Sequence, residues 1–445
     1  MSNDIMKQDN IKETRIIHSL ITFGTLVAVM AVAIIIYEVD PHVPMFVGVI
    51  AASGMAMYLG YSWEQIEKSM MEGIYRALQS IMILAIIGIL IGVWIVGGIV
   101  PAMIYYGLKL LTPGMFLVAT VLICSITSLA TGSSWGTMGT MGLALMGVAH
   151  GLGIPAGVAG GAIISGAYFG DKVSPLSDTT NLAPAMAGTD VFTHIKFMMQ
   201  STAVTYAITL IFFGGLSYHY SSGASVVDMS QVTEMSDGLA KSFNINPLLL
   251  LPPIIVIISM ALKVPAIPGI TAGIIIGAIF GMIFQGDHCT LGSVMGCGMS
   301  GYESQIGIKS LDKLLSAGGL KNMMNSISLT IIAMMFGGIM EKTKQLEVIV
   351  KAFMSITKRP AGMVLMTEIT CVTSNMAMPE QYISIVVPGR MYEPAYKAAG
   401  LHPKTLSNAL ESAGTVTSAL VPWNTCGVFI AATLGIQVKQ YFPFA

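Results

Sequence analysis

Charged residues are scarce in this 445-residue chain, where Asp, Glu, Lys and Arg together make up 10% of the sequence. Soluble proteins carry about 25% of these residues, so the composition excludes a water-exposed globular surface. The formal net charge of -1 excludes the basic surface of a nucleic-acid-binding protein. The five cysteines show no C-x-x-C spacing, and the absence of a Gly-Lys dipeptide excludes a Walker A site for ATP.

The sequence is instead rich in long apolar runs, and 54% of its residues are hydrophobic. Apolar runs of about 20 residues recur along the chain, and each can cross the roughly 30 Å of hydrocarbon in a bilayer as a helix. Clear examples are residues 16–37, 43–59, 78–100 and 265–284. These runs predict an all-α polytopic membrane protein with about ten to twelve spans, embedded in the lipid bilayer of the cell (plasma) membrane.

Polar segments divide the chain into parts. The first fifteen residues are polar and basic, which predicts a cytoplasmic N-terminus under the positive-inside rule and does not predict a cleavable signal peptide. A long polar linker in the interior carries an excess of acidic residues, and we expect it outside the cell. The predicted parts are a tail at 1–15, a first half at 16–217, an extracellular linker at 218–246 and a second half at 247–445.

The second half repeats the pattern of the first. Residues 73–81 (GIYRALQSI) match residues 319–327 (GLKNMMNSI), and weaker matches follow in the same order. The loop after the third span holds only Lys109 as a basic residue in the first half. Its counterpart holds Lys342, Lys344, Lys351, Lys358 and Arg359. The same element thus ends on opposite sides of the membrane, which predicts two inverted-topology repeats with broken or re-entrant helices. A merely duplicated helix bundle is the alternative.

One polar stretch, residues 168–184 (YFGDKVSPLSDTTNLAP), lies between apolar runs. Oxygen ligands this dense are costly at membrane depth unless they face a cavity, a partner or an ion. A break rich in glycine and hydroxyl groups at residues 131–142 precedes it. The candidate ion ligands from these two segments are Ser133, Ser134, Asp171, Ser174, Asp178, Thr179, Thr180 and Asn181.

Matching positions of the second half carry a second polar set, in breaks at 373–381 and 411–425. Its members are Asn375, Glu380, Glu411, Thr415, Ser418, Asn424 and Thr425. In inverted-repeat transporters, interrupted helices from both halves form the substrate site near the middle of the membrane. We therefore expect the two polar sets to form one ion-binding site.

Hard oxygen ligands of this kind suit a small hard cation such as Na⁺. Because desolvation favours the protonated form of a carboxylate, one such group can hold either a proton or a sodium ion. We rank Asp178 and Glu411 first, as proton-coupling groups and, with Thr179 and Asn424, as the sodium ligands. Glu368, a lone acid in an apolar run, is a third candidate for proton coupling.

Structural roles are the alternative for these groups. Asp171 has Lys172 as its neighbour, which offers it a salt bridge and ranks it below Asp178. The hydroxyl groups can bond backbone carbonyls, and Glu380 can cap the start of a helix. A G-x-S-x-G match at residues 132–136 lies in membrane-helix sequence without His and Asp partners, so we do not expect an enzyme.

The chain resembles the NhaC-type sodium/proton antiporter family of the ion-transporter superfamily. The resemblance spans essentially the full chain and rests on four motifs: residues 131–136 (TGSSWG), 170–184 (GDKVSPLSDTTNLAP), 410–415 (LESAGT) and 421–426 (VPWNTC). It implies exchange of cytoplasmic sodium for external protons. Some members of the family resemble exchangers of organic acids instead, taking up malate with protons while releasing sodium and lactate.

These observations predict a secondary active transporter that exchanges cytoplasmic Na⁺ for external H⁺ by alternating access. The alternative is an exchanger of small carboxylates or amino acids on the same fold, coupled to Na⁺ or H⁺. A channel would need no coupling carboxylate. We expect no resident cofactor, with Na⁺ and H⁺ as transported ions, and no nucleic-acid partner; a homodimer is compatible with the pattern, although no residue indicates its interface.

Overall fold

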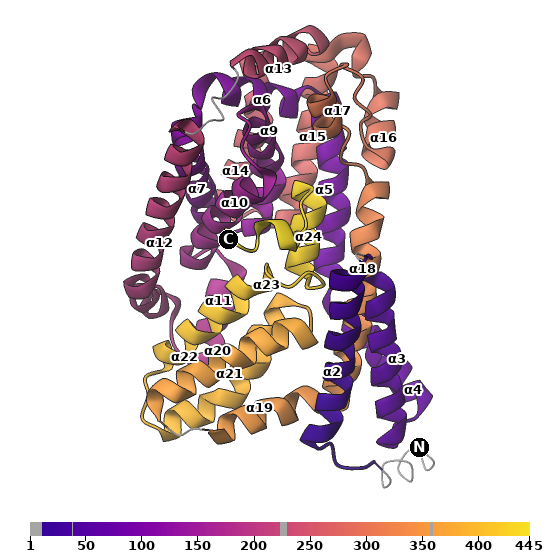
Figure 1. The fold of residues 1–445 in the computed structure, drawn as a ribbon, viewed down its shortest axis with the longest axis vertical. Coiled ribbons are helices and arrows are strands. Elements are labelled where there is room, and N and C mark those ends of the chain that lie inside the picture. The colour runs from indigo at the N-terminus through magenta and orange to yellow at the C-terminus, as the bar shows by residue number, and fades with distance from the viewer. Residues whose placement is uncertain (1–10, 38, 223–228, 357–358) are drawn as a thin grey trace. The chain divides into compact units, whose positions relative to one another are not determined.

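The regular elements of the protein are helices throughout the described residues of its computed structural model, which are 11–37, 39–222, 229–356 and 359–445 (Figure 1). This confirms the all-α prediction. Residues 1–10 of the predicted tail and residues 223–228 of the predicted linker lie outside the described ranges. Of the remaining linker, residues 229–242 form a helix rather than an extended connection.

Within the described residues, five helices are long and apolar enough to cross a membrane. They are α5 (Leu78–Val96), α7 (Pro113–Thr131), α12 (Val191–Ser222), α15 (Ala266–Gln285) and α18 (Leu320–Lys342). A sixth candidate is a pair bent by 100°, formed by α13 (Met229–Ser242) with the segment Pro247–Ala261. Shorter apolar helices add to these, so the chain is a multi-pass membrane protein. The ten to twelve spans remain a prediction.

The chain divides into two compact units. The first unit comprises Met1–Ile81, Leu182–Asp190 and Ser326–Val428, and the second comprises Met82–Asn181, Val191–Asn325 and Phe429–Ala445. Each unit takes segments from both predicted halves of the sequence. The units are therefore a different division from the predicted repeats, and the inverted repeat stays a prediction.

The first unit is built around two groups of packed helices. In one group α2 packs on α3; in the other α20, α21 and η6 contact one another. Arg76 at the end of α4 forms an ion pair with Glu341 of α18. Besides most of α18, this unit contains α2 (Ile16–Ala31), η2 (Val32–Ile36), α3 (His42–Tyr58), α4 (Trp63–Arg76), α19 (Gln345–Ile356), α20 (Pro360–Ala377), α21 (Gln381–Ala398), α22 (Pro403–Ala409), η6 (Leu410–Thr415) and α23 (Val416–Ser418).

The second unit centres on α7, which contacts α10, α12 and α14. Besides most of α5, it contains α6 (Ile99–Leu110), α7, α8 (Ser134–Thr137), η3 (Met138–Gly142), α9 (Leu143–Gly151), α10 (Ala156–Val173), α12, α13, η4 (Pro247–Leu250), α14 (Leu251–Ala261), α15, η5 (Gly286–His288), α16 (Leu291–Ser300), α17 (Lys309–Leu315) and α25 (Val438–Tyr441). Like α5 and α18, the helices α11 (Asp178–Ala187) and α24 (Thr425–Leu434) contain residues of both units.

An apolar face of α12 is open to its surroundings. Val204, Ile208 and Ile211 are 61%, 61% and 74% exposed. Their spacing of four and three residues places them on one side of the helix. A face of large apolar side chains is unfavourable in water but suits contact with lipid.

Close packing of α7 on α10 positions the polar residues that follow both helices. The two helices lie side by side in the second unit (Figure 1). Gly166 and Gly170 on α10 face the backbone of α7, and a Cβ at Gly170 would overlap the carbonyl of Ser125. Small residues four apart let helix backbones approach in this way. The Ser128 hydroxyl adds an interhelical hydrogen bond of 2.6 Å to the Ala167 carbonyl.

Candidate ion-binding site

Helices are interrupted at all four polar stretches of the sequence. In the second unit α7 ends at Thr131 and α8 begins at Ser134, while α10 ends at Val173 and α11 begins at Asp178. In the first unit α20 ends at Ala377 and α21 begins at Gln381, while α23 ends at Ser418 and α24 begins at Thr425. These interruptions leave backbone groups and polar side chains free to form local hydrogen bonds.

Gly132 makes the first break possible. Its φ of 66° lies in the left-handed region, which glycine adopts without strain. A Cβ at this position would lie 2.6 Å from the backbone carbon of Leu176, so the two breaks of the second unit are in close contact. Ser133 then caps α8, because its Oγ accepts a 3.0 Å hydrogen bond from the Gly136 amide.

Asp171 is held across this contact by Ser134. The Ser134 hydroxyl and amide donate hydrogen bonds of 2.6 Å and 3.1 Å to Oδ2 of Asp171. The aspartate is only 6% exposed and Ser134 only 1%. Among the candidate residues, the structure therefore brings Ser134 and Asp171 together, although they lie 37 positions apart.

The turn between α10 and α11 is fixed by side chains that bond backbone carbonyls. Ser174 Oγ donates to the Leu129 carbonyl at 2.8 Å, and Thr180 Oγ1 donates to the Asp171 carbonyl at 3.1 Å. Asn181 Nδ2 donates to the Ser177 carbonyl at 2.7 Å. These contacts match the structural alternative for the three residues.

Asp178 and Thr179 lie at the start of α11 and differ in burial. Asp178 is the first residue of the helix, where the helix dipole favours a carboxylate, and its side chain is exposed. Thr179 is 4% exposed, and its Oγ1 lies 3.1 Å from Oγ of Ser177. Of the two aspartates in this motif, Asp178, which is ranked first from the sequence, has an exposed side chain, whereas Asp171 is buried.

Glu411 belongs to the polar set of the first unit and is fully buried. It is 0% exposed and lies on η6, a π-helical turn that contacts both α20 and α21. The carbonyl of Gly414 on the same turn accepts hydrogen bonds from Asn375 Nδ2 at 2.8 Å and from Ser384 Oγ at 3.2 Å. A Cβ at Gly414 would lie 3.2 Å from Oγ of Ser384, so this approach is close. Thr415 is also buried at 0% exposure.

Asn424 links the two breaks of the first unit. Its Nδ2 donates to the carbonyl of Asn375 at 3.1 Å, and its Oδ1 accepts from the Cys426 amide at 3.1 Å. The Thr425 amide donates to the Pro379 carbonyl at 3.0 Å. Asn375, Asn424 and Thr425 thus lie in one buried network, in which every side chain is at most 1% exposed.

Three further candidates have separate positions. Glu380 is 3% exposed and caps α21, with Oε2 accepting from the Tyr382 amide at 2.7 Å and the Ile383 amide at 3.3 Å. Glu368 is half-buried on α20. Ser418 is buried and donates to the carbonyl of Thr415 at 2.6 Å. Ser384 is a polar contact of this set that was not predicted. The sequence feature that points to it is its position in the first turn of the helix that follows Glu380.

Comparison with known proteins identifies the family. The model of the Na⁺/H⁺ antiporter family matches residues 166–445, which contain Asp171 and Asp178 of the second unit and Glu411 and Asn424 of the first. The chain belongs to the Na⁺/H⁺ antiporter family. Its resemblance to NhaC-type proteins is thereby confirmed.

Curated relatives of this antiporter-family chain align over nearly its full length. The malate-2H⁺/Na⁺-lactate antiporter of Bacillus subtilis is 36% identical over 425 residues, which are 96% of this chain and 90% of the relative. The Na⁺/H⁺ antiporter NhaC of Alkalihalophilus pseudofirmus is 35% identical over 98% of this chain and 93% of its own length. The arginine/ornithine antiporter ArcD of Halobacterium salinarum is 33% identical over 96% and 88%.

The candidate residues of this family member fall into two clusters, each within one unit. Asp171 and Asp178 belong to the second unit, and Glu411 and Asn424 belong to the first. Each cluster offers carboxylate, hydroxyl and amide oxygens, the donor type that suits a hard cation. A single sodium site formed by Asp178, Thr179, Glu411 and Asn424 remains a prediction.

Proposed function

We propose that this chain is a secondary active transporter that exchanges cytoplasmic Na⁺ for external H⁺ by alternating access. Membership of the Na⁺/H⁺ antiporter family supports Na⁺ and H⁺ as the two exchanged ions. The observation that carries the proposal is the presence of buried carboxylates, Asp171 and Glu411, at interrupted helices of a multi-pass membrane protein. Such groups are costly in an apolar environment and are retained where ions bind or pass.

The proposed sodium ligands are Asp178, Thr179, Glu411 and Asn424. Asp178 is exposed and so accessible to a hydrated ion, whereas Glu411 is fully buried. A carboxylate that binds a proton cannot bind sodium at the same time with equal strength, because the two cations neutralise the same charge. This competition couples the opposite movements of the two ions. Glu368, half-buried on α20, is the third proposed proton-coupling group.

Asp171 and Ser134, with Ser174, Thr180 and Asn181, are further proposed members of the ion-binding set. Ser134 fixes one carboxylate oxygen of Asp171, and Thr180 bonds the Asp171 backbone carbonyl. Ser174 and Asn181 hold the turn that carries Asp178. Rigid support of this kind keeps ion ligands in position. Ser133, Thr415, Ser418 and Thr425 complete the proposed ion-binding set.

The membrane arrangement is part of the same proposal. We propose two inverted-topology repeats at 16–217 and 247–445, joined by an extracellular linker, with the N-terminus in the cytoplasm of a cell whose plasma membrane holds the protein. The helix breaks at matching positions of the two halves support it. A cysteine-accessibility experiment with a single cysteine at position 3 or 237 tests which side each segment occupies.

Exchange of a small organic substrate is the second candidate function. The printed names of two relatives, a malate-2H⁺/Na⁺-lactate antiporter and an arginine/ornithine antiporter, favour it. In this alternative the hydroxyl and amide groups at the helix breaks bind a carboxylate of the substrate, and Na⁺ or H⁺ is coupled to its movement.

Everted membrane vesicles separate the two functions. With an acidified interior, addition of NaCl alone should release protons and restore the fluorescence of a trapped pH-sensitive dye if Na⁺ exchanges directly for H⁺. Recovery that occurs only with malate, lactate, arginine or ornithine present would contradict the proposed sodium/proton exchange and support the alternative.

Site variants test the residues in the same vesicles. Asp178→Asn and Glu411→Gln should each abolish sodium-driven proton release at normal expression, because each removes a charge that both ions need. Asp237→Asn is the matched control: this exposed aspartate lies on α13, outside both clusters, and should exchange normally. Full activity of Asp178→Asn would remove that residue from the site.

A further inference from the structure

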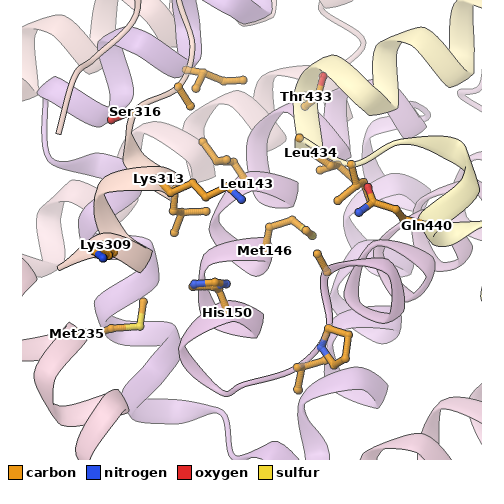
Figure 2. Close-up of a pocket in the computed structure, with 18 of the residues that line it drawn as sticks. Leu143, Met146, His150, Met235, Lys309, Lys313, Ser316, Thr433, Leu434 and Gln440 are labelled. Atoms are coloured by element: carbon orange, nitrogen blue, oxygen red, sulfur yellow. The ribbon is translucent and has the colours of Figure 1, made fainter. Parts of the chain in front are cut away.

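The cavity of the second unit does not suit a cation that has left water. It has a volume of about 900 Å³, and all of its lining residues belong to that unit (Figure 2). Its lining contains Lys309, Lys313 and Glu234 but none of the candidate ion ligands, so it offers a cation no net attraction. A dehydrated cation therefore needs oxygen ligands elsewhere, and several fully buried ones lie in the first unit.

The helices α20 and α21 of the first unit pack side by side, and both contact η6 (Figure 1). Two contacts fix their register. Thr367 Oγ1 lies 3.0 Å from the Tyr396 hydroxyl, and Thr370 Oγ1 lies 2.9 Å from the Tyr392 hydroxyl. Ser374 follows Thr370 by four residues, so it lies on the same face of α20 and is directed toward α21.

The hydroxyl of Ser374 behaves differently from those of its neighbours on α20. Thr367, Thr370 and Thr373 each donate to the carbonyl four residues earlier, at 2.7 to 2.8 Å. Ser374 is 0% exposed, and its Oγ has no hydrogen-bond partner among the described residues. The same holds for Thr415 Oγ1 on η6. Because an unbonded buried hydroxyl is unfavourable, both oxygens are suited to contact a bound species.

Pro388 adds a backbone oxygen from α21. It lies inside the helix and has no N–H, so the carbonyl of Ser384, four residues earlier, lacks its usual helical donor. The pairing of α20 with α21, continued by one turn, places Ser374 opposite this part of α21. A Cβ at Gly414 would lie 3.4 Å from the Ser384 carbonyl oxygen, so this oxygen also reaches η6. In a membrane helix such a carbonyl needs a partner other than its own helix.

We propose that the Ser374 hydroxyl, the Thr415 hydroxyl and the Ser384 carbonyl bind the transported cation together with the Glu411 carboxylate. The inference rests on the proposed sodium/proton exchange, which identifies this cation as Na⁺. Glu411 lies on η6 at 0% exposure and supplies the negative charge. Hydroxyl and carbonyl oxygens replace the water around a hard cation. All four residues belong to the first unit, so this end of the proposed site is built within one unit.

Binding of radioactive Na⁺ to the purified full chain in detergent, at alkaline pH where protons compete least, tests the site. We expect saturable binding by the wild type. Ser374→Ala should weaken it about tenfold or more, because the cation loses an oxygen ligand, whereas Ser374→Thr keeps the hydroxyl and should bind within about threefold. Thr373→Val removes a neighbouring hydroxyl that bonds its own helix and should bind as the wild type does. No saturable Na⁺ binding by the wild type would overturn the proposal.

Pro388→Ala tests the backbone ligand. Alanine restores an amide that donates to the Ser384 carbonyl, so this oxygen is withdrawn from the cation and Na⁺ binding should weaken about tenfold. Pro394→Ala is the matched control, because it replaces an exposed proline of the same helix and should bind Na⁺ within about twofold of the wild type. An equal loss of binding in Pro394→Ala would show that the shape of α21, and not the Ser384 carbonyl, controls the affinity.

Thermal unfolding without Na⁺ checks that each variant folds, and the vesicle assay separates the two proposals. If Ser374→Ala and Pro388→Ala unfold like the wild type and bind Na⁺ equally well, the site assignment is wrong even where the wild type exchanges Na⁺ for H⁺. A buried water bonded to the two hydroxyls would give that result. If the variants lose Na⁺ binding but NaCl drives no proton release in wild-type vesicles, the site assignment holds and the proposed exchange is wrong.

Discussion

Replacing Ser134 by alanine removes the hydrogen bond that its hydroxyl donates to the Asp171 carboxylate. The hydroxyl bond of 2.6 Å is lost, whereas the backbone amide bond of 3.1 Å remains. The perturbation is small in volume and lies at the start of α8, whose cap is the neighbouring Ser133. Its effect on stability therefore reports the hydroxyl–carboxylate bond and little else.

The magnitude follows from the length and burial of this bond. A distance of 2.6 Å lies in the range of charge-assisted O–H···O⁻ bonds. Such a bond contributes about 1.5–3 kcal/mol to stability, against about 1 kcal/mol for a neutral pair. We expect Ser134→Ala to lower the free energy of unfolding by about 1.5–3 kcal/mol in the wild-type background. In an Asp171→Asn background the loss should fall to about 1 kcal/mol.

Unfolding in mixed detergent micelles, followed by tryptophan fluorescence, measures both values and their difference. Ser201→Ala removes an exposed hydroxyl on α12 that donates to its own helix, and it should change the unfolding free energy by less than about 0.5 kcal/mol. Equal losses from Ser134→Ala in the presence and absence of the aspartate would refute a direct charged bond.

Three other features give expected outcomes. Gly170→Ala should cost about 1–3 kcal/mol of unfolding free energy because its Cβ overlaps the backbone of α7, whereas Gly24→Ala, where a Cβ meets no atom, should be neutral or stabilising in the same unfolding assay. Asn424→Ala should cost more than about 2 kcal/mol in that assay, since it leaves a buried carbonyl and a buried amide unbonded; a loss below about 0.5 kcal/mol would contradict the network. Hydrogen bonds from a serine hydroxyl and two amides lower the pKa of Asp312. Its stabilising effect is complete above the unfolded pKa of about 3.9 and is lost as the pH falls through the lower folded value. Amide hydrogen exchange in residues 304–312 should accelerate over that acidic range, and in Asp312→Asn it should be rapid at all pH values. An unchanged exchange rate in that variant would show that the hydrogen bonds from Ser304, Ile306 and Gly307 to Asp312 do not hold this loop in place.

The helix interruptions could be predicted from the sequence because their causes are local. Gly132 occupies a left-handed position that other residues adopt only with strain, and the breaks at 174–177 and 378–380 each contain a proline. At these breaks glycine and proline act through their own backbone preferences, so no knowledge of distant contacts is needed, although Pro388 and Pro394 are tolerated inside α21. The all-α architecture could be predicted in the same way, from the length of the apolar runs.

The burial of individual carboxylates could not be predicted, because it depends on distant segments. The sequence analysis ranked Asp171 below Asp178 on account of the adjacent Lys172. Successive residues of a helix point in directions about 100° apart, so adjacency in sequence does not predict a side-chain contact. The observed partner of Asp171 is Ser134, which reaches it only because α7 and α10 pack together.

The division into two units could not be predicted from the sequence either. Hydropathy predicts where helices lie but not which of them associate. The first unit combines segments that start at positions 1, 182 and 326, and such associations depend on the shapes of packed surfaces.

The π-helical turn η6 has a consequence for insertions and deletions. A π turn holds one residue more than an α-helical turn, so removing a single residue between Leu410 and Thr415 would convert it into regular α-helix. The segments on either side would stay nearly in register, because the wider turn already accommodates the extra residue, and the change of side-chain direction would be confined to the turn that carries Glu411. Glu411 would keep its chemistry and lose its orientation, which makes the number of residues in this turn as important as their identity.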